Sequence, residues 1–132
     1  MAATWTVLVV DDDPLVRKMI RSMLEQRLGL IVTEAADGRE AMDIFRQSQA
    51  DLVLLDAKMP KLDGFKVCEK MRRLAYGADV PILMVTALAD SESVKHAMAV
   101  GATDFVTKPV NWAILGQLIE KYLGQNAAAT AE

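Results

Sequence analysis

The sequence predicts a single α/β domain in which a parallel β-sheet is covered by helices on both faces. The chain has 132 residues, of which 52% are hydrophobic and 25% are charged, a composition typical of a folded domain with a substantial core. Five short apolar segments alternate with five segments of helical periodicity. Strict alternation of this kind indicates parallel strands that are joined by helical crossovers.

The predicted strands are short and rich in Val, Ile and Leu, and three of them contain almost no polar residue. They are Thr6–Val10, residues 30–33, Leu52–Leu55, residues 80–85 and Asp104–Thr107. The last of these is the least apolar. Continuous apolar runs are typical of strands that are buried on both faces, as in a parallel sheet.

Each predicted helix begins at a residue whose side chain can accept hydrogen bonds from free backbone N–H groups. Asp13 and Pro14 begin the first helix and Gly29 ends it, because aspartate favours the N-cap, proline the first turn and glycine the C-terminal cap. The second runs from Asp37 to about Gln47. The others run from Asp63 to Tyr76, from Asp90 or Ser91 to Gly101, and from Asn111 to Leu123.

Apolar residues at i, i+4 spacing on these helices are predicted to face the sheet. We interpret the methionines as core residues, because flexible thioether side chains fill irregular gaps. They are Met19, Met23, Met71, Met84 and Met98. Cys68 is expected to be a small buried residue of the third helix, and His96 is expected to be solvated.

Polar side chains stand at the ends of four of the five strands. Asp11 and Asp12 follow the first strand, Asp56 follows the third, Thr86 the fourth and Lys108 the fifth. The carboxyl ends of parallel strands lie at one edge of the sheet, where open α/β sheets bind their ligands. We therefore expect these side chains to converge on one functional site.

The residue types at this edge indicate metal-assisted phosphoryl transfer to a carboxylate. Three crowded carboxylates repel one another unless a cation is present, and a set of hard oxygen ligands suits Mg²⁺ that keeps several waters. A lysine and a hydroxyl beside that ion can hold phosphoryl oxygens. Aspartate can itself attack phosphorus and form an acyl phosphate. Asp13 is left out of the site because it is expected to cap a helix.

Composition excludes several other classes of protein. One His and one Cys leave almost no material for a zinc site or a Cys/His catalytic pair, and the single Cys68 fits a cytoplasmic location. No apolar run approaches the length of a membrane span, and the first residues show no basic segment followed by an apolar one, so neither a membrane span nor secretion is expected. The net charge of −3 argues against direct nucleic-acid binding by this chain.

Four segments resemble the receiver domain of two-component response regulators. They occur in the order VLVVDDDPLVR, LVLLDAKMPKLDG, PILMVTA and GATDFVTKP, and the resemblance covers residues 5–123. It implies a flavodoxin-like (βα)5 doubly wound parallel sheet with strand order 2-1-3-4-5. Residues 1–124 would form the receiver domain, and residues 125–132 a C-terminal tail or the start of a linker.

The resemblance also implies a role for each residue of the site. Asp56 would be the phosphoryl acceptor, and Mg²⁺ would be held by Asp11, Asp12 and Asp56 with the backbone carbonyl of Lys58. The donor would be a phosphohistidine on a sensor histidine kinase or a phosphotransfer protein.

Further implications concern catalysis and signalling. Thr86 and Lys108 would act with Asp56 on the phosphoryl group, Thr86 and Phe105 would form the switch, and the Lys108–Pro109 peptide would be cis. The face made by the fourth helix, fifth strand and fifth helix would control an output domain or effector protein, or support a phosphorylation-dependent homodimer. The chain would catalyse only its own phosphorylation and dephosphorylation.

The segment TKPVNWAILGQLIEKYL is similar to receivers that are attached to diguanylate cyclase or phosphodiesterase outputs.

Three alternatives remain beside the receiver interpretation. A haloacid-dehalogenase-type phosphatase would use Asp11 as nucleophile and Asp13 as acid, but Leu15 stands where that pattern has a hydroxyl residue. A flavin carrier would need a phosphate loop in place of the acidic residues after the first strand. A receiver-like module could also bind partners without phosphorylation.

Overall fold

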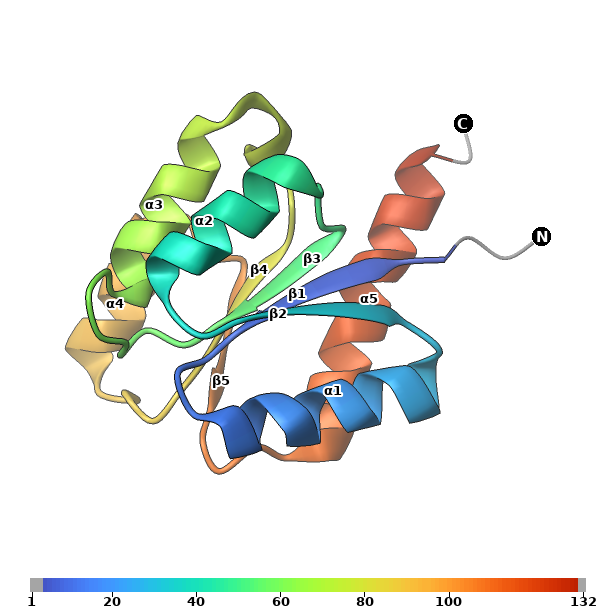
Figure 1. The fold of residues 1–132 in the computed structure, drawn as a ribbon, viewed down its shortest axis with the longest axis horizontal. Coiled ribbons are helices and arrows are strands. Elements are labelled where there is room, and N and C mark those ends of the chain that lie inside the picture. Colours follow the sequence, from blue (N-terminus) through green and yellow to red (C-terminus); the bar gives the residue numbers. More distant parts are fainter. Residues whose placement is uncertain (1–3, 131–132) are drawn as a thin grey trace.

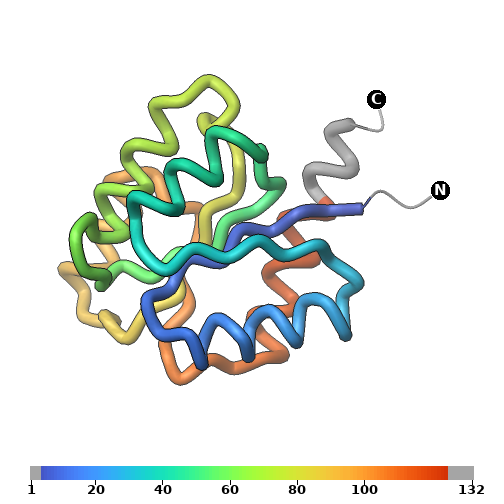
Figure 2. The backbone as a smooth tube through the Cα atoms, in the orientation of Figure 1, coloured from blue at the N-terminus to red at the C-terminus, as the bar shows by residue number. Residues whose placement is uncertain are grey.

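The structure is a computed structural model that describes the backbone of residues 4–130 and the side chains of residues 4–124. Its centre is a parallel sheet with strand order β2-β1-β3-β4-β5, which confirms the predicted fold. The strands are β1 (Thr6–Val10), β2 (Ile31–Ala35), β3 (Leu52–Leu55), β4 (Ile82–Thr86) and β5 (Asp104–Thr107). From β1 the chain winds outward to β2, then returns and continues in the opposite direction through β3, β4 and β5 (Figure 2).

Helices cover both faces of the sheet (Figure 1). The helices are α1 (Pro14–Leu28), α2 (Gly38–Gln47), α3 (Gly64–Arg73), α4 (Ser91–Ala99) and α5 (Trp112–Thr130), with a short 3-10 helix, η1 (Ala75–Gly77), after α3. α1 and α5 lie on one face, and α2, α3 and α4 lie on the other. This arrangement leaves the carboxyl ends of the strands accessible at one edge.

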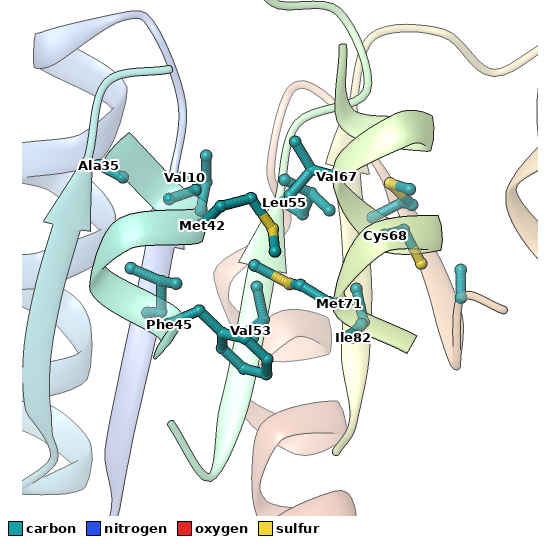
Figure 3. Close-up of a cluster of buried hydrophobic side chains, with 14 of the residues drawn as sticks. Val10, Ala35, Met42, Phe45, Val53, Leu55, Val67, Cys68, Met71 and Ile82 are labelled. Carbon is teal, nitrogen blue, oxygen red and sulfur yellow. The ribbon is translucent and has the colours of Figure 1, made fainter. Parts of the chain in front are cut away.

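Successive residues of the central strands β1, β3 and β4 point into two separate hydrophobic cores. Leu8 and Val10 of β1 face the core under α2 and α3, whereas Val7 and Val9 face the core under α1 and α5. In the first core the fully buried ring of Phe45 packs among the side chains shown in Figure 3. Burial of both strand faces explains why these strands are almost continuously apolar.

The structure confirms the predicted helix caps. The side chain of Asp13 accepts a hydrogen bond from the backbone N–H of Leu15 at 2.9 Å, and Gly29 ends α1 in the left-handed conformation with φ of 64°. Asp37, Asp63 and Asp90 cap α2, α3 and α4 in the same way. Because the Asp13 carboxylate is occupied by the helix terminus, it does not resemble the free acid that a dehalogenase-type phosphatase would need.

Some element boundaries differ from the predicted ones. β2 extends to Ala35 and β4 to Thr86, so Thr86 is the last residue of its strand. α3 ends at Arg73 because Leu74 adopts an extended conformation. α5 continues to Thr130, beyond Gly124, because the alanine-rich segment that follows has high helix propensity. The division into a domain and a linker at residue 125 stays a prediction.

The interpretation of the methionines as core residues is wrong for two of them. Met23, Met71 and Met84 are buried, but Met19 is 47% exposed and Met98 is 49% exposed. On α1 the contact with the sheet is made by other positions of the apolar stripe, so Met19 lies at its outer edge.

The buried state of Cys68 is confirmed, and burial raises the pKa of its thiol to about 11. His96 is exposed, and its ring stacks on Phe65 with centroids 4.1 Å apart.

Within the described part of the chain, no helix combines the length and the hydropathy that a membrane crossing requires.

The side chain of Arg72 ties α3 to the segments that precede β4 and β5. Its guanidinium donates to the carbonyl oxygens of Gly77, Val80 and Gly101 and to Oγ1 of Thr103. Burial lowers the pKa of Arg72, yet four acceptors on these two segments hold the charged group in place. These contacts fix where β4 and β5 begin.

We predict that Arg72→Met lowers the free energy of unfolding by at least about 2 kcal/mol, because partly buried carbonyl groups lose their donor. Arg73→Met is the matched control: its side chain is 73% exposed and pairs with Glu69, so the expected change is within about 0.5 kcal/mol. Urea unfolding followed by circular dichroism measures both. Equal losses in the two variants would show that the Arg72 contacts do not stabilise the fold.

Candidate functional site

The site lies where the direction of winding reverses, between the carboxyl ends of β1 and β3. Val10 and Leu55 are paired neighbours at the ends of these strands, and the backbone N–H of Asp56 donates to the carbonyl of Val10 at 3.0 Å. The residues that follow, Asp11 and Asp56, are therefore placed side by side. Crossovers that leave in opposite directions open a crevice at such a point, which is where open α/β sheets bind ligands.

Three carboxylates meet in this crevice, as predicted. Oxygens of Asp11, Asp12 and Asp56 all lie within 4.8 Å of one another. Asp11 is 2% exposed and Asp56 is 6% exposed, whereas Asp12 faces solvent. Two anchored carboxylates and one at the solvent boundary provide hard oxygen donors and leave space for water, which is the chemistry that Mg²⁺ requires. The residues present therefore fit a magnesium site.

Lys108 reaches from the end of β5 into the same crevice. Its Nζ atom donates to Oδ2 of Asp11 at 2.6 Å and to Oδ2 of Asp56 at 3.0 Å. Burial alone would lower the pKa of Lys108, but these contacts outweigh it and raise the pKa overall. Lys108 is thus a fixed cation that bridges the two buried carboxylates.

Burial raises the pKa of Asp11 above its ordinary value, although the contact with Lys108 and the N–H of Asp13 act in the opposite direction. The N–H of Asp13 donates to Oδ1 of Asp11 at 2.9 Å. In the same way, the N–H of Lys58 donates to Oδ1 of Asp56 at 3.1 Å. Each buried carboxylate therefore has one oxygen on a backbone N–H and the other on the Lys108 ammonium.

The loop after β3 brings the start of α3 against Asp56. The N–H of Gly64 donates to the carbonyl of Ala57 at 2.9 Å, and a Cβ atom at Gly64 would lie 2.1 Å from the carbonyl oxygen of Asp56. Only glycine permits this approach, which holds the backbone around Asp56 in place. The carbonyl of Lys58 is part of this loop, and its role as a metal ligand stays a prediction.

The two residues predicted to form the switch lie on β4 and β5. Thr86 is 1% exposed, and its Oγ1 accepts a hydrogen bond from the N–H of Leu88 at 3.3 Å. Its carbonyl accepts from the N–H of Lys108 at 2.9 Å, so Thr86 and Lys108 share one edge. Phe105 is paired with Met84 in the sheet and packs, half-buried, against the core on the α4 side. The Lys108–Pro109 peptide is cis.

Sequence reasoning missed two residues beside the site. Arg17 donates to the backbone carbonyl of Asp11 at 2.7 Å and to Glu34 at 3.1 Å. Arg17 stands at the end of the quoted segment VLVVDDDPLVR, but its spacing from Asp11 says nothing of a contact with a main-chain atom. Glu34 lies on β2, and no neighbouring residue in the sequence indicates that it contacts Arg17 near the site.

Comparison with known proteins assigns the family. The family model for the response regulator receiver domain matches residues 7–120. The chain therefore belongs to the receiver-domain family of two-component response regulators, whose members are signalling domains.

Individual relatives agree with this assignment. The chain is 44% identical over 103 residues to a probable transcriptional regulator, ycf27, of Guillardia theta, with 78% of this chain and 39% of the relative covered. Among solved structures it is similar to the chemotaxis protein CheY4 of Vibrio cholerae, with a TM-score of 0.86, 34% identity, and coverage of 91% and 99%. The receiver domain of sensor histidine kinase PA1611 from Pseudomonas aeruginosa PAO1 gives a TM-score of 0.85, 31% identity, and coverage of 92% and 99%. That structure has a magnesium ion coordinated in its active-site cleft.

We predict that Lys108→Met destabilises the protein by about 1–3 kcal/mol when Mg²⁺ is absent, because two buried carboxylates lose their shared donor. MgCl₂ is expected to raise the unfolding midpoint of this variant by more than that of the wild type, since the ion replaces the lost positive charge. Thermal unfolding with and without MgCl₂ measures this, and Lys95→Met, at an exposed position of α4, is the control. An equal response to MgCl₂ in all three proteins would contradict the prediction.

Proposed function

We propose that Asp56 accepts a phosphoryl group from a phosphohistidine, with Mg²⁺ bound beside it, and that the chain passes this signal to an output domain or effector protein. The observation that carries the proposal is the environment of Asp56: a buried carboxylate within 4.8 Å of two others and 3.0 Å from the Lys108 ammonium. Such a group is placed for nucleophilic attack at phosphorus with charge compensation at hand.

In the proposed reaction, a bond forms from a carboxylate oxygen of Asp56 to phosphorus as the phosphorus–nitrogen bond of the donor breaks. The donor imidazole leaves with the electron pair of that bond. Mg²⁺, held by Asp11, Asp12, Asp56 and the carbonyl of Lys58, would neutralise charge on the transferring group. Lys108 holds its ammonium at the Asp56 carboxylate before the transfer, and this ammonium can then follow the charge onto a phosphoryl oxygen.

An apolar surface beside the site supports a protein as the phosphoryl donor. A groove of about 580 Å³ is lined by Met19, Trp112, Val16, Val110 and Lys108, among others. Leu15 on the same helix is 65% exposed. Exposed apolar groups of this kind mark protein contacts, and Lys108 belongs to both the groove and the phosphorylation site.

The chain spans about two-fifths of the length of ycf27 from Guillardia theta, so the output that the receiver controls is proposed separately from the phosphorylation. A receiver is compatible with several outputs: a transcriptional output on a longer chain, a diguanylate cyclase or phosphodiesterase output, a free effector protein, or a homodimer. We also propose a cytoplasmic location, because the single Cys68 leaves no partner for a disulfide within the chain.

We predict that acetyl phosphate with Mg²⁺ adds one phosphoryl group to the wild type, and that Asp56→Asn abolishes the addition because the amide is not a nucleophile toward phosphorus. Intact-mass spectrometry measures the adduct. Asp43→Asn, which removes an exposed carboxylate of α2, is expected to leave labelling unchanged. Undiminished, Mg²⁺-dependent labelling of Asp56→Asn would overturn the assignment of the acceptor.

The output surface is proposed to be the face of α4, β5 and α5. α4 is held weakly, since Ala97 is its one fully buried residue, whereas α3 buries Gly64, Val67, Cys68 and Met71. Elements with few buried contacts open at low free-energy cost. Thr86 and Phe105 connect this helix with the acceptor edge, so a change at Asp56 has a short route to it.

We predict that beryllofluoride with Mg²⁺ changes amide hydrogen exchange in α4, β5 and the start of α5, while α2 keeps its protection. The physical reason is that a phosphoryl-like group adds negative charge that attracts the Thr86 hydroxyl, and reorientation of this hydroxyl would disturb its contact with the N–H of Leu88 before α4. Mass spectrometry of exchanged peptides gives the readout, and Asp56→Asn under the same conditions is the control. Changes restricted to α1 and α2 would rule out this output surface.

A further inference from the structure

Every hydrogen-bonding atom of Asp11 is occupied. Its backbone N–H donates to the carbonyl of Ala35 at 3.1 Å, and its carboxylate oxygens accept from the N–H of Asp13 and from Lys108. Its backbone carbonyl accepts from Nη1 of Arg17 at 2.7 Å. Three of these partners follow from the strand, the helix cap and the crevice, but the Arg17 contact has no such origin.

Arg17 is itself held by an ionic chain that runs away from the site. Its Nε donates to Oε1 of Glu34 on β2 at 3.1 Å, and Oε2 of Glu34 accepts from Nη1 of Arg21 at 2.8 Å. The side chains of Arg17 and Glu34 are 17% and 24% exposed. The contact with Arg21, followed by that with Arg17, lowers the pKa of Glu34 despite its burial. The guanidinium of Arg17 is thus fixed between a carboxylate and the carbonyl of Asp11.

The carbonyl of Asp11 and the N–H of Asp12 belong to one rigid peptide plane. A donor that fixes the carbonyl therefore fixes the orientation of this plane and the point from which the Asp12 side chain departs. Asp12 is exposed, so no burial of its own side chain does this. The two carboxylates that flank this plane are the ones proposed to hold Mg²⁺ together.

We propose that Arg17 is a positioning residue for the metal site, which sets the Asp11–Asp12 peptide for Mg²⁺ binding through its contact with the Asp11 carbonyl and its anchorage on Glu34. The inference rests on the proposed function, since it needs Mg²⁺ to bind at these carboxylates. Groups that orient metal ligands in this way typically contribute about 10–100-fold in metal affinity.

The sign of the effect separates positioning from simple electrostatics. Arg17 carries a positive charge close to a cation site, so by Coulomb's law its removal favours Mg²⁺. If Arg17 acted only through its charge, an uncharged variant would bind Mg²⁺ more tightly. Positioning predicts the opposite, because the peptide plane gains freedom that Mg²⁺ binding must then remove.

The test is a MgCl₂ titration followed by backbone amide chemical shifts around Asp56. Arg17→Met, which keeps the aliphatic stem, is expected to raise the dissociation constant of Mg²⁺ by about tenfold. Arg21→Met is the matched control: it removes a cation and a contact with the same Glu34 without touching Asp11, and its expected change is less than about twofold. Urea unfolding in the absence of Mg²⁺ reports the stability of each variant.

A second variant, Arg17→Lys, keeps the charge but cannot span both acceptors, and weaker Mg²⁺ binding is expected here too. If Arg17→Met does not fold, Arg17→Lys still tests whether Arg17 positions the Asp11–Asp12 peptide. Unchanged or tighter binding in these variants would overturn the inference while leaving the proposed function intact. Failure of the wild type to bind Mg²⁺ at all would overturn both. Equal weakening in Arg17→Met and Arg21→Met would also overturn it, because the effect would then be general loosening of α1.

Discussion

The contact of the Lys108 ammonium with Asp11 and Asp56 is the interaction on which the rest of the site depends. Two carboxylates that are almost completely buried would repel each other and lose hydration, and Lys108 compensates both at distances of 2.6 and 3.0 Å. The three residues follow β1, β3 and β5, so their geometry is only as precise as the sheet that aligns those strands. Burial of both faces of the sheet provides that precision, because close-packed cores transmit small displacements instead of absorbing them.

The convergence of the acidic residues and Lys108 could be predicted from the sequence because it needs only the positions of the strands and the rule that parallel strands end at one edge. The caps at Asp13 and Gly29 could also be predicted from the sequence, since they depend on local backbone chemistry. Contacts that depend on the orientation of a helix could not be predicted in this way. Met19 has the spacing of a core residue, but which part of the apolar stripe on α1 meets the sheet is decided by tertiary packing, and Met19 lies outside it. Arg17 was missed for a related reason: its partner at the site is a main-chain carbonyl, which has no signature in the sequence.

The ends of the helices show the same division between local and tertiary control. Gly29 ends α1 because it adopts the left-handed conformation with φ of 64°, whereas α5 continues past Gly124 to Thr130. A glycine permits a C-terminal cap but does not impose one, and the following alanines favour a further helical turn. Leu74 ends α3 in the extended conformation without any glycine or proline signal at that position. Arg72 then ties the segments after it to α3, which is a constraint from tertiary structure.

Charge balance indicates that phosphorylation of the proposed acceptor would favour a rearrangement of the site. Three carboxylates and the Lys108 ammonium together carry a net charge of −2, which one Mg²⁺ brings to zero. Conversion of a carboxylate of charge −1 into an acyl phosphate of about −2 leaves one excess negative charge in a crevice whose fixed cation is already engaged. The hydroxyl of Thr86 at the same edge is an uncharged donor, and its oxygen now accepts from the N–H of Leu88. A movement of the hydroxyl toward new phosphoryl oxygens would disturb that contact with the backbone after β4. Thr86 is followed by α4, the helix with a single fully buried residue, so the helix next to this contact is also one that the core restrains weakly.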